Sequence, residues 1–216
     1  MIQQGKEKYK GTLKEMWKQC FPHDSDQFIK FYFNKVYKND ETLIFVENAQ
    51  PVAALQMIPY SLKIGETVYS AGYISGAMTH PDFQKKGYMG QLLNAAFEAM
   101  KDKGFDYTFL IPQEEWLFEF YERFGYQRFV SSFNDFKDLK DFKVLKEINS
   151  YAEHTRFLAT LPNAVLKSEE QFSNIVADCL ADGSNLIDLK EKRGMIKKLN
   201  PSAEIVTHLY LGRMLD

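Results

Sequence analysis

The stretch of the sequence best suited to chemistry runs from Gln84 to Gly90 (Gln-Lys-Lys-Gly-Tyr-Met-Gly), between a predicted strand and a predicted helix. Two lysines and two glycines in such a loop can form an anion site, because successive backbone N–H groups face a ligand in front of the helix amino terminus. Gly87 lets a phosphate approach the backbone closely and can adopt a positive φ. Lys85 and Lys86 add positive charge. The anion that this pattern fits is a pyrophosphate.

Two familiar nucleotide motifs are absent from this segment. It contains neither the Gly-x-x-x-x-Gly-Lys-Ser/Thr of a P-loop nor the Gly-x-Gly-x-x-Gly of a dinucleotide fold. On residue types alone, an ordinary turn between a strand and a helix, with two solvated lysines, remains an alternative to the phosphate loop.

The segment resembles the signature of the GNAT acetyltransferases, Gln/Arg-x-x-Gly-x-Gly/Ala after a splayed strand. Gln84 and Gly87 match it, whereas Met89 stands at the last Gly/Ala position and departs from it. Downstream, residues 120–126 (Phe-Tyr-Glu-Arg-Phe-Gly-Tyr) are similar to the family's helix-ending Phe-Tyr-Glu-x-x-Gly-Phe/Tyr. Together the two matches cover about residues 70–130. A finer resemblance is to bacterial members with a C-terminal extension, related to the enhanced-intracellular-survival type.

The resemblance implies acetyl-CoA as co-substrate and assigns roles to particular residues. The pantetheine arm is expected to pair with the backbone of Ala77, Met78 and Thr79, whose N–H groups also polarise the thioester carbonyl. Tyr121 is expected to protonate the departing thiolate. The alternative is that the three strand residues only pair within the sheet and that Tyr121 is a core residue. The remaining cofactor-binding positions are expected to be Gln84, Lys85, Lys86, Gly87, Tyr88, Met89 and Gly90.

The reaction that follows is transfer of an acetyl group to a primary amine by direct attack in a ternary complex. No cysteine lies in the motif region, which argues against a covalent acyl-enzyme there. The general base is not assigned, because the strand expected over residues 67–79 carries no carboxylate. The carboxylates left to consider are those of Glu114, Glu115, Glu119 and the terminal Asp216. The missing strand carboxylate favours an alternative function, a non-catalytic acyl-CoA-binding regulatory module.

Periodicity and turn signals predict the elements that position these residues. Helices are expected over 6–20 and from a cap at Asp24 or Ser25 onwards. Strands are expected over 42–47, 52–58 (closed by Pro59), 61–64 and 67–79. They are followed by a helix that ends at Gly104, a strand over 105–111, a helix over 114–124 and a strand over 126–136. This order predicts an α/β fold of GNAT type, with a mixed, mostly antiparallel sheet flanked by helices on both faces.

The rest of the chain is predicted to be a small C-terminal α/β extension, which divides it into a domain over 1–136 and an extension over 137–216. Residues 137–160 are expected to form a connector and a short helix. A Ser168-x-x-Gln171 capping box predicts a helix that reaches Cys179 or Leu180. Further strands are expected over 185–189 and 204–211.

Composition limits the partners and the location. The net charge of −2 gives no reason to expect nucleic acid, and no apolar run approaches the roughly 18 residues of a membrane span. Two distant cysteines and four scattered histidines show no ligand spacing, so no metal is expected. We expect a cytoplasmic protein, with a homodimer as one possible state. The amine acceptor cannot be read from the sequence.

Overall fold

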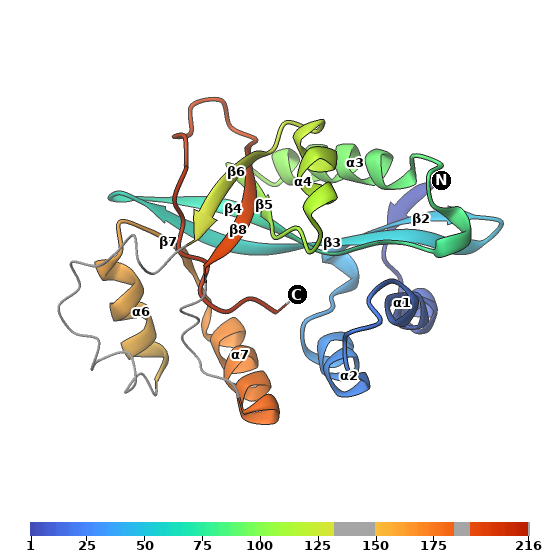
Figure 1. The fold of residues 1–216 in the computed structure, drawn as a ribbon, viewed down its shortest axis with the longest axis horizontal. Coiled ribbons are helices and arrows are strands. Elements are labelled where there is room, and N and C mark those ends of the chain that lie inside the picture. The colour runs from blue at the N-terminus through green and yellow to red at the C-terminus, as the bar shows by residue number, and fades with distance from the viewer. Residues whose placement is uncertain (132–149, 184–190, 216) are drawn as a thin grey trace. The chain divides into compact units, whose positions relative to one another are not determined.

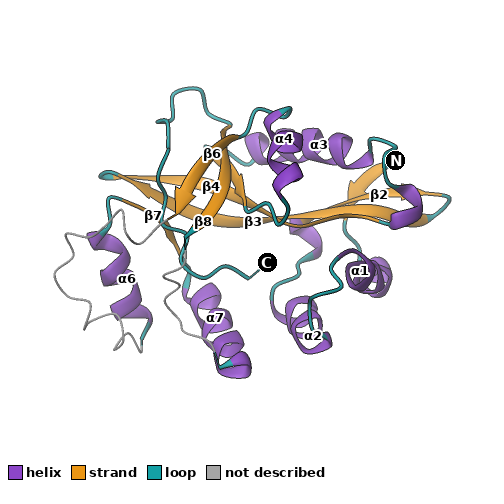
Figure 2. Cartoon of the chain, in the orientation of Figure 1, coloured by secondary structure: helices purple, strands orange, loops and turns teal. Residues whose placement is uncertain are grey.

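The computed structural model describes residues 1–131, 150–183 and 191–215 (Figures 1 and 2). Short 3₁₀ turns precede β2 (Asn39–Glu41) and follow β4 (Pro81–Phe83). The strands and helices are β1 (Ile2–Gln4), α1 (Glu7–Cys20), α2 (Asp26–Lys35), β2 (Thr42–Glu47), β3 (Gln50–Ile64), β4 (Thr67–Thr79), α3 (Tyr88–Asp102), β5 (Tyr107–Leu110), α4 (Glu115–Glu122), β6 (Gln127–Ser131), α6 (Tyr151–Thr160), β7 (Asn163–Leu166), α7 (Glu169–Asp182) and β8 (Lys192–Lys198).

Within the described residues the strands form an eight-stranded sheet in the order β1-β2-β3-β4-β5-β8-β6, and β7 pairs with β3. The pairs β1–β2, β2–β3, β3–β7, β5–β8 and β6–β8 are all antiparallel. The predicted α/β class with a mostly antiparallel sheet is therefore confirmed. Two of the strands, β7 and β8, come from the part of the chain predicted to be an extension.

The chain divides into two compact units that are interleaved along the sequence. The first unit comprises Met1–Ile58 and Gly72–Gly104, and the second comprises Pro59–Ala71 and Phe105–Leu215. The long strands β3 and β4 each contribute one part to either unit. The boundary at residue 136 remains a prediction.

In the first unit, α1 and α2 cover one face of the strands and α3 covers the other (Figure 1). The predicted cap of α2 is Ser25, whose hydroxyl accepts a hydrogen bond from the Phe28 N–H at 3.1 Å. Both helices bury an aromatic-rich stripe against the sheet, which explains why they form on it. The stripe consists of Leu13, Met16, Trp17, Ile29, Tyr32 and Phe33.

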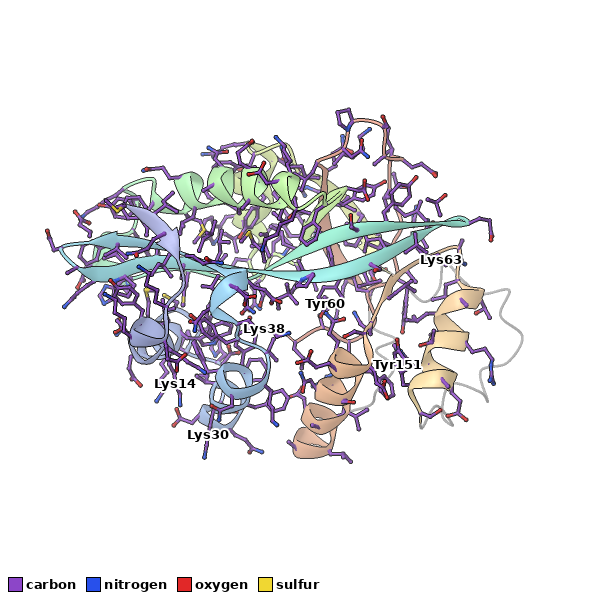
Figure 3. The ribbon with its side chains drawn as sticks, turned by 180° about the vertical axis from the view of Figure 1, so that it is seen from behind. Lys14, Lys30, Lys38, Tyr60, Lys63 and Tyr151 are labelled. Carbon is purple, nitrogen blue, oxygen red and sulfur yellow. The ribbon has the colours of Figure 1, made fainter. Side chains whose placement is uncertain are left out.

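In the second unit, side chains tie the helices to the strands. The Lys63 ammonium on β3 donates to the carbonyls of Ala159 and Leu161, at 2.9 and 2.6 Å, at the end of α6 (Figure 3). The predicted capping box of α7 is confirmed, since Ser168 and Gln171 each accept from the other's backbone N–H. The helix continues to Asp182, slightly beyond the predicted end.

Two sequence predictions are wrong. Pro59 does not end a strand, because β3 runs through it to Ile64. Proline removes one N–H but leaves the backbone extended, and the Pro59 carbonyl accepts a hydrogen bond from the Gln171 side chain at 2.9 Å. Residues 204–211 form no strand, only isolated bridges at His208 and Tyr210. The expected strand over 185–189 and the connector over 137–149 lie outside the described residues.

Three observations concern membrane spans, metal sites and cysteines. Within the described residues, no helix combines the length and the apolar character needed to cross a bilayer. The same residues contain no group of three or more His, Cys, Asp or Glu side chains that could hold a metal ion. Cys20 and Cys179 are free thiols.

Candidate acetyl-CoA site

The loop before α3 has the backbone geometry of an anion site. Gly87, which occupies the N-cap position of α3, has a φ of 78°, and Lys85 has a φ of 62°. Two left-handed residues within three positions bend the chain sharply, and no side chain caps the helix. An uncapped amino terminus leaves the first N–H groups of α3 to be satisfied by solvent or by a ligand. A Cβ built on Gly87 would meet no atom within 4 Å, so the loop is open to an approaching group.

The loop before α3 carries two exposed cationic side chains. Lys85 and Lys86 are both exposed, and the Lys86 ammonium lies 4.5 Å above the ring of Phe83. The Gln84 amide turns back and donates to the Thr79 carbonyl at 3.4 Å. This contact joins the loop to the end of β4, so two segments of the expected site meet in the first unit.

Tyr88 has a structural task that the motif does not reveal. Its hydroxyl donates to the Glu47 carboxylate at 2.6 Å, and its ring stacks on Phe45 with centroids 4.3 Å apart. The hydrogen bond to Glu47 raises the pKa of the Tyr88 phenol. These contacts dock the first turn of α3 on β2. Any role of Tyr88 in holding a cofactor therefore falls to its backbone. Met89 and Gly90 follow it, half-buried, on the first turn.

The strand β4 contains a left-handed residue immediately before the segment where the thioester is expected. Gly76 has a φ of 56° inside the strand, and a Cβ at this position would lie 2.5 Å from Cζ3 of Trp17. Glycine at this position therefore allows the close approach of the Trp17 ring to the backbone. Immediately after it, Ala77 and Thr79 are half-buried and Met78 is buried. The Thr79 carbonyl also accepts from the Cys20 thiol at 3.4 Å.

A chain of buried hydrogen bonds lies under this part of β4. Ser75 pairs with the Tyr32 hydroxyl at 2.8 Å, and Tyr32 donates to the Gln56 carbonyl oxygen at 2.9 Å. The Gln56 amide in turn donates to the Glu41 carboxylate at 3.2 Å. Burial raises the pKa of Glu41. The sequence prediction missed this chain, although a glutamine within the apolar run Val52–Ile58 is a signal that could have pointed to it.

Tyr121 lies on α4 in the second unit. Its side chain is buried beside Phe120 and Tyr126, with ring centroids 5.2 and 5.7 Å away. Burial raises the pKa of its phenol to about 12, which keeps the group protonated at neutral pH. Within the described residues its hydroxyl has no hydrogen-bond partner.

Two of the three carboxylates of α4, those of Glu115 and Glu122, form ion pairs. Glu115 accepts from Arg193 at 2.7 Å, and Glu122 accepts from Arg128 at 2.7 Å. These side chains are at least partly exposed, so we interpret them as surface ion pairs and assign neither carboxylate as the general base. Asp216 lies outside the described residues.

Comparison with known proteins places the chain in a family. A family profile described as an acetyltransferase (GNAT) domain matches residues 2–129, more than half of the chain. Among curated proteins, no match was found.

Solved structures of low sequence identity share the fold. A GCN5-related N-acetyltransferase from Anabaena variabilis superposes with a TM-score of 0.60 at 10% identity, over 93% of this chain and 73% of the other. A probable N-acyltransferase from Enterococcus faecalis gives 0.56 at 11% identity, over 78% and 46%. Eis1 from Mycobacterium abscessus gives 0.51 at 11% identity, over 61% and 32%. The chain spans less than half of the length of the last two proteins. Its matched profile and its fold agree, and the chain belongs to the GNAT acetyltransferase family.

Proposed function

We propose that the protein is an N-acetyltransferase that moves an acetyl group from acetyl-CoA to a primary amine. The observation that carries the proposal is the open amino terminus of α3, which no side chain caps and which left-handed Lys85 and Gly87 precede, in the connection that follows β4. The N–H groups of this loop and the two lysines would hold the pyrophosphate. Gln84, Tyr88, Met89 and Gly90 would complete the binding segment through the loop and the first turn.

The acyl end of the cofactor would lie on β4. The pantetheine arm would pair with the backbone of Ala77, Met78 and Thr79, and their N–H groups would stabilise the oxyanion. The neutral amine attacks the thioester carbonyl, the C–N bond forms, and the C–S bond of the tetrahedral intermediate breaks. Tyr121 would give its proton to the departing thiolate, while the proton of the amine passes to solvent or to a base.

Binding of the cofactor is tested first by calorimetry with acetyl-CoA and a Gly87→Glu variant. The new carboxylate fills the open space in front of the helix and repels the pyrophosphate. Gly104→Glu is a matched control, because Gly104 lies at the other end of α3, also has a positive φ (75°) and is also open. We expect loss of binding in the first variant and native affinity in the second. No binding by the native protein would refute the proposal.

Turnover is tested with a panel of amines in a thiol-release assay. Tyr121→Phe should lower kcat, by on the order of 10²-fold or more, while the affinity for acetyl-CoA stays native. Tyr126→Phe is the control, since this buried phenol is paired with Thr108 at 3.0 Å. Equal rates in the native protein and in Tyr121→Phe would remove Tyr121 from the mechanism.

A second candidate is a regulatory module that binds acyl-CoA without catalysis. It is favoured by the absence of a carboxylate on β4 between Thr67 and Thr79. Acetyl-CoA binding without thiol release for any amine in the panel would support it over the enzyme.

A further inference from the structure

The loop proposed to hold the pyrophosphate is fixed at both of its ends. At its start, the Gln84 amide donates to the Thr79 carbonyl at the end of β4, at 3.4 Å. At its end, the Tyr88 hydroxyl donates to the Glu47 carboxylate on β2, at 2.6 Å. Residues 85–87 lie between these two contacts and include both left-handed positions of the loop. The backbone that would face the anion is therefore a short segment between two fixed points.

Two side chains of β2 hold Tyr88 on the face of the sheet that α3 covers (Figure 1). Phe45 stacks on its ring, with centroids 4.3 Å apart and 24° between the planes, and Glu47 accepts its hydroxyl. Residues two apart on a strand share a face, and Ile44 and Val46 pack on the opposite side, with the core of α1 and α2. The ring and the hydroxyl of Tyr88 are thus held separately, one by stacking and one by a charge-assisted hydrogen bond.

The backbone that carries Glu47 is itself fixed. Glu47 forms the last pair of the β2–β3 ladder with Gln50, and the turn between them consists of Asn48 and Ala49, both with positive φ (49° and 64°). A two-residue turn of this kind matches the twist of the two strands and closes the hairpin tightly. The Glu47 carboxylate is therefore an acceptor on a rigid element, which is the condition for positioning another group.

We infer that Tyr88, held by Glu47, positions the N–H groups at the amino terminus of α3 for the pyrophosphate of the donor. This inference rests on the proposed function. Tyr88 is the first residue of α3, so a change in its backbone direction moves the N–H groups that the helix leaves unpaired. No side chain caps this terminus, and the contacts with β2 fix it instead. An anion that meets N–H groups already in place pays less to order them. Both residues are positioning residues, and neither side chain touches the donor.

The first test compares Tyr88→Phe with the native protein in calorimetric titrations with acetyl-CoA. The variant keeps the stacked ring and loses only the hydroxyl, so binding should weaken by roughly three- to tenfold, the scale of one hydrogen bond. Tyr37→Phe is the matched control. Tyr37 also stacks on a phenylalanine (Phe33, 5.2 Å) and also donates to a side-chain oxygen (Asn39, 3.0 Å), but it packs with the core of α1 and α2. This control should bind acetyl-CoA with native affinity.

A second ligand and a conservative variant separate positioning from a general loss of structure. Acetyl-pantetheine lacks the pyrophosphate, and its weak binding can be followed through amide chemical shifts in an NMR titration. The native protein and Tyr88→Phe should bind it equally. Glu47→Gln keeps an acceptor oxygen for the Tyr88 hydroxyl and should bind acetyl-CoA at least as tightly as the native protein does.

Each outcome separates the inference from the function on which it rests. Equal affinity of the native protein and Tyr88→Phe for acetyl-CoA overturns the inference and leaves the proposed function intact. An equal loss for acetyl-CoA and acetyl-pantetheine does the same, as does a loss in Glu47→Gln or Tyr37→Phe as large as that in Tyr88→Phe. If acetyl-pantetheine does not bind detectably, Glu47→Gln and Tyr37→Phe decide the matter. Absence of acetyl-CoA binding by the native protein overturns both the inference and the function.

Discussion

Replacement of Gly76 by alanine is the sharpest test of the packing under the proposed site. Two costs add at this position. The first is the φ of 56°, which an L-residue adopts at a cost of roughly 1–2 kcal/mol. The second is the new Cβ, which would lie 2.5 Å from Trp17 and force the ring or the strand to shift. Overpacking of this kind costs roughly 1–3 kcal/mol. We therefore expect a loss of about 2–5 kcal/mol in the free energy of unfolding.

A second glycine of the same unit separates the two costs. Gly104 has a φ of 75°, and a Cβ there would meet no atom within 4 Å. Gly104→Ala should thus show only the backbone cost of about 1–2 kcal/mol. Urea denaturation followed by tryptophan fluorescence measures both variants, since Trp17 is buried in the first unit whereas Trp116 is 65% exposed.

The reasoning fails if both glycine variants lose the same stability, since the contact between Trp17 and Gly76 would then carry no energy. A double-mutant cycle, followed by circular dichroism because it replaces Trp17, gives a further check. In a Trp17→Leu background the steric part of the Gly76→Ala cost should largely disappear, which gives a coupling energy of about 1–3 kcal/mol. Additive losses would show that the two residues do not press on each other.

Three further predictions concern polar groups. Tyr32→Phe removes the donor to Gln56 and should cost about 1–3 kcal/mol, measured by urea denaturation. Burial and the nearby Lys167 charge lower the pKa of His154 to about 4, below its ordinary value near 6.5. As the pH is lowered, the unfolded chain therefore binds the proton before the folded chain does. The free energy of unfolding should fall by up to about 3 kcal/mol between about pH 6.5 and pH 4. His154→Phe should remove most of this pH dependence. Ser168→Ala should cost about 1 kcal/mol through loss of the α7 cap, seen as a lower Tm.

The sequence predicted the local features of the fold well because they depend on local chemistry. The α3 loop, the cap of α2 at Ser25 and the capping box at Ser168 all follow from residue types at fixed spacing. The strands β7 and β8 were missed since their stability comes from distant partners. The strand Lys192–Lys198 is rich in lysine and carries no clear alternation, yet it pairs with both β5 and β6. Pairing of this kind is decided by tertiary context.

In the candidate site, too, the features set by local sequence were predicted and the contacts between distant residues were not. Gly87 was singled out because glycine permits backbone angles that other residues resist. The side-chain contacts around the site could not be inferred, since no local pattern brings Trp17 onto β4 or Glu41 into contact with Gln56. Sequence reasoning therefore predicted the backbone of the candidate site and missed the side chains that pack against it.

The proposed roles of the donor-binding residues and of Tyr121 can be tested separately. The residues proposed to bind the donor run from Ala77 to Gly90, whereas Tyr121 is proposed only to protonate the departing thiolate. The affinity for acetyl-CoA should then depend only on the residues from Ala77 to Gly90, whereas turnover should also depend on Tyr121. Gly87→Glu should abolish binding and turnover together, whereas Tyr121→Phe should lower kcat at unchanged affinity. Loss of acetyl-CoA affinity in Tyr121→Phe would contradict this separation, because a proton donor that acts only on the departing thiolate contributes nothing to ground-state binding.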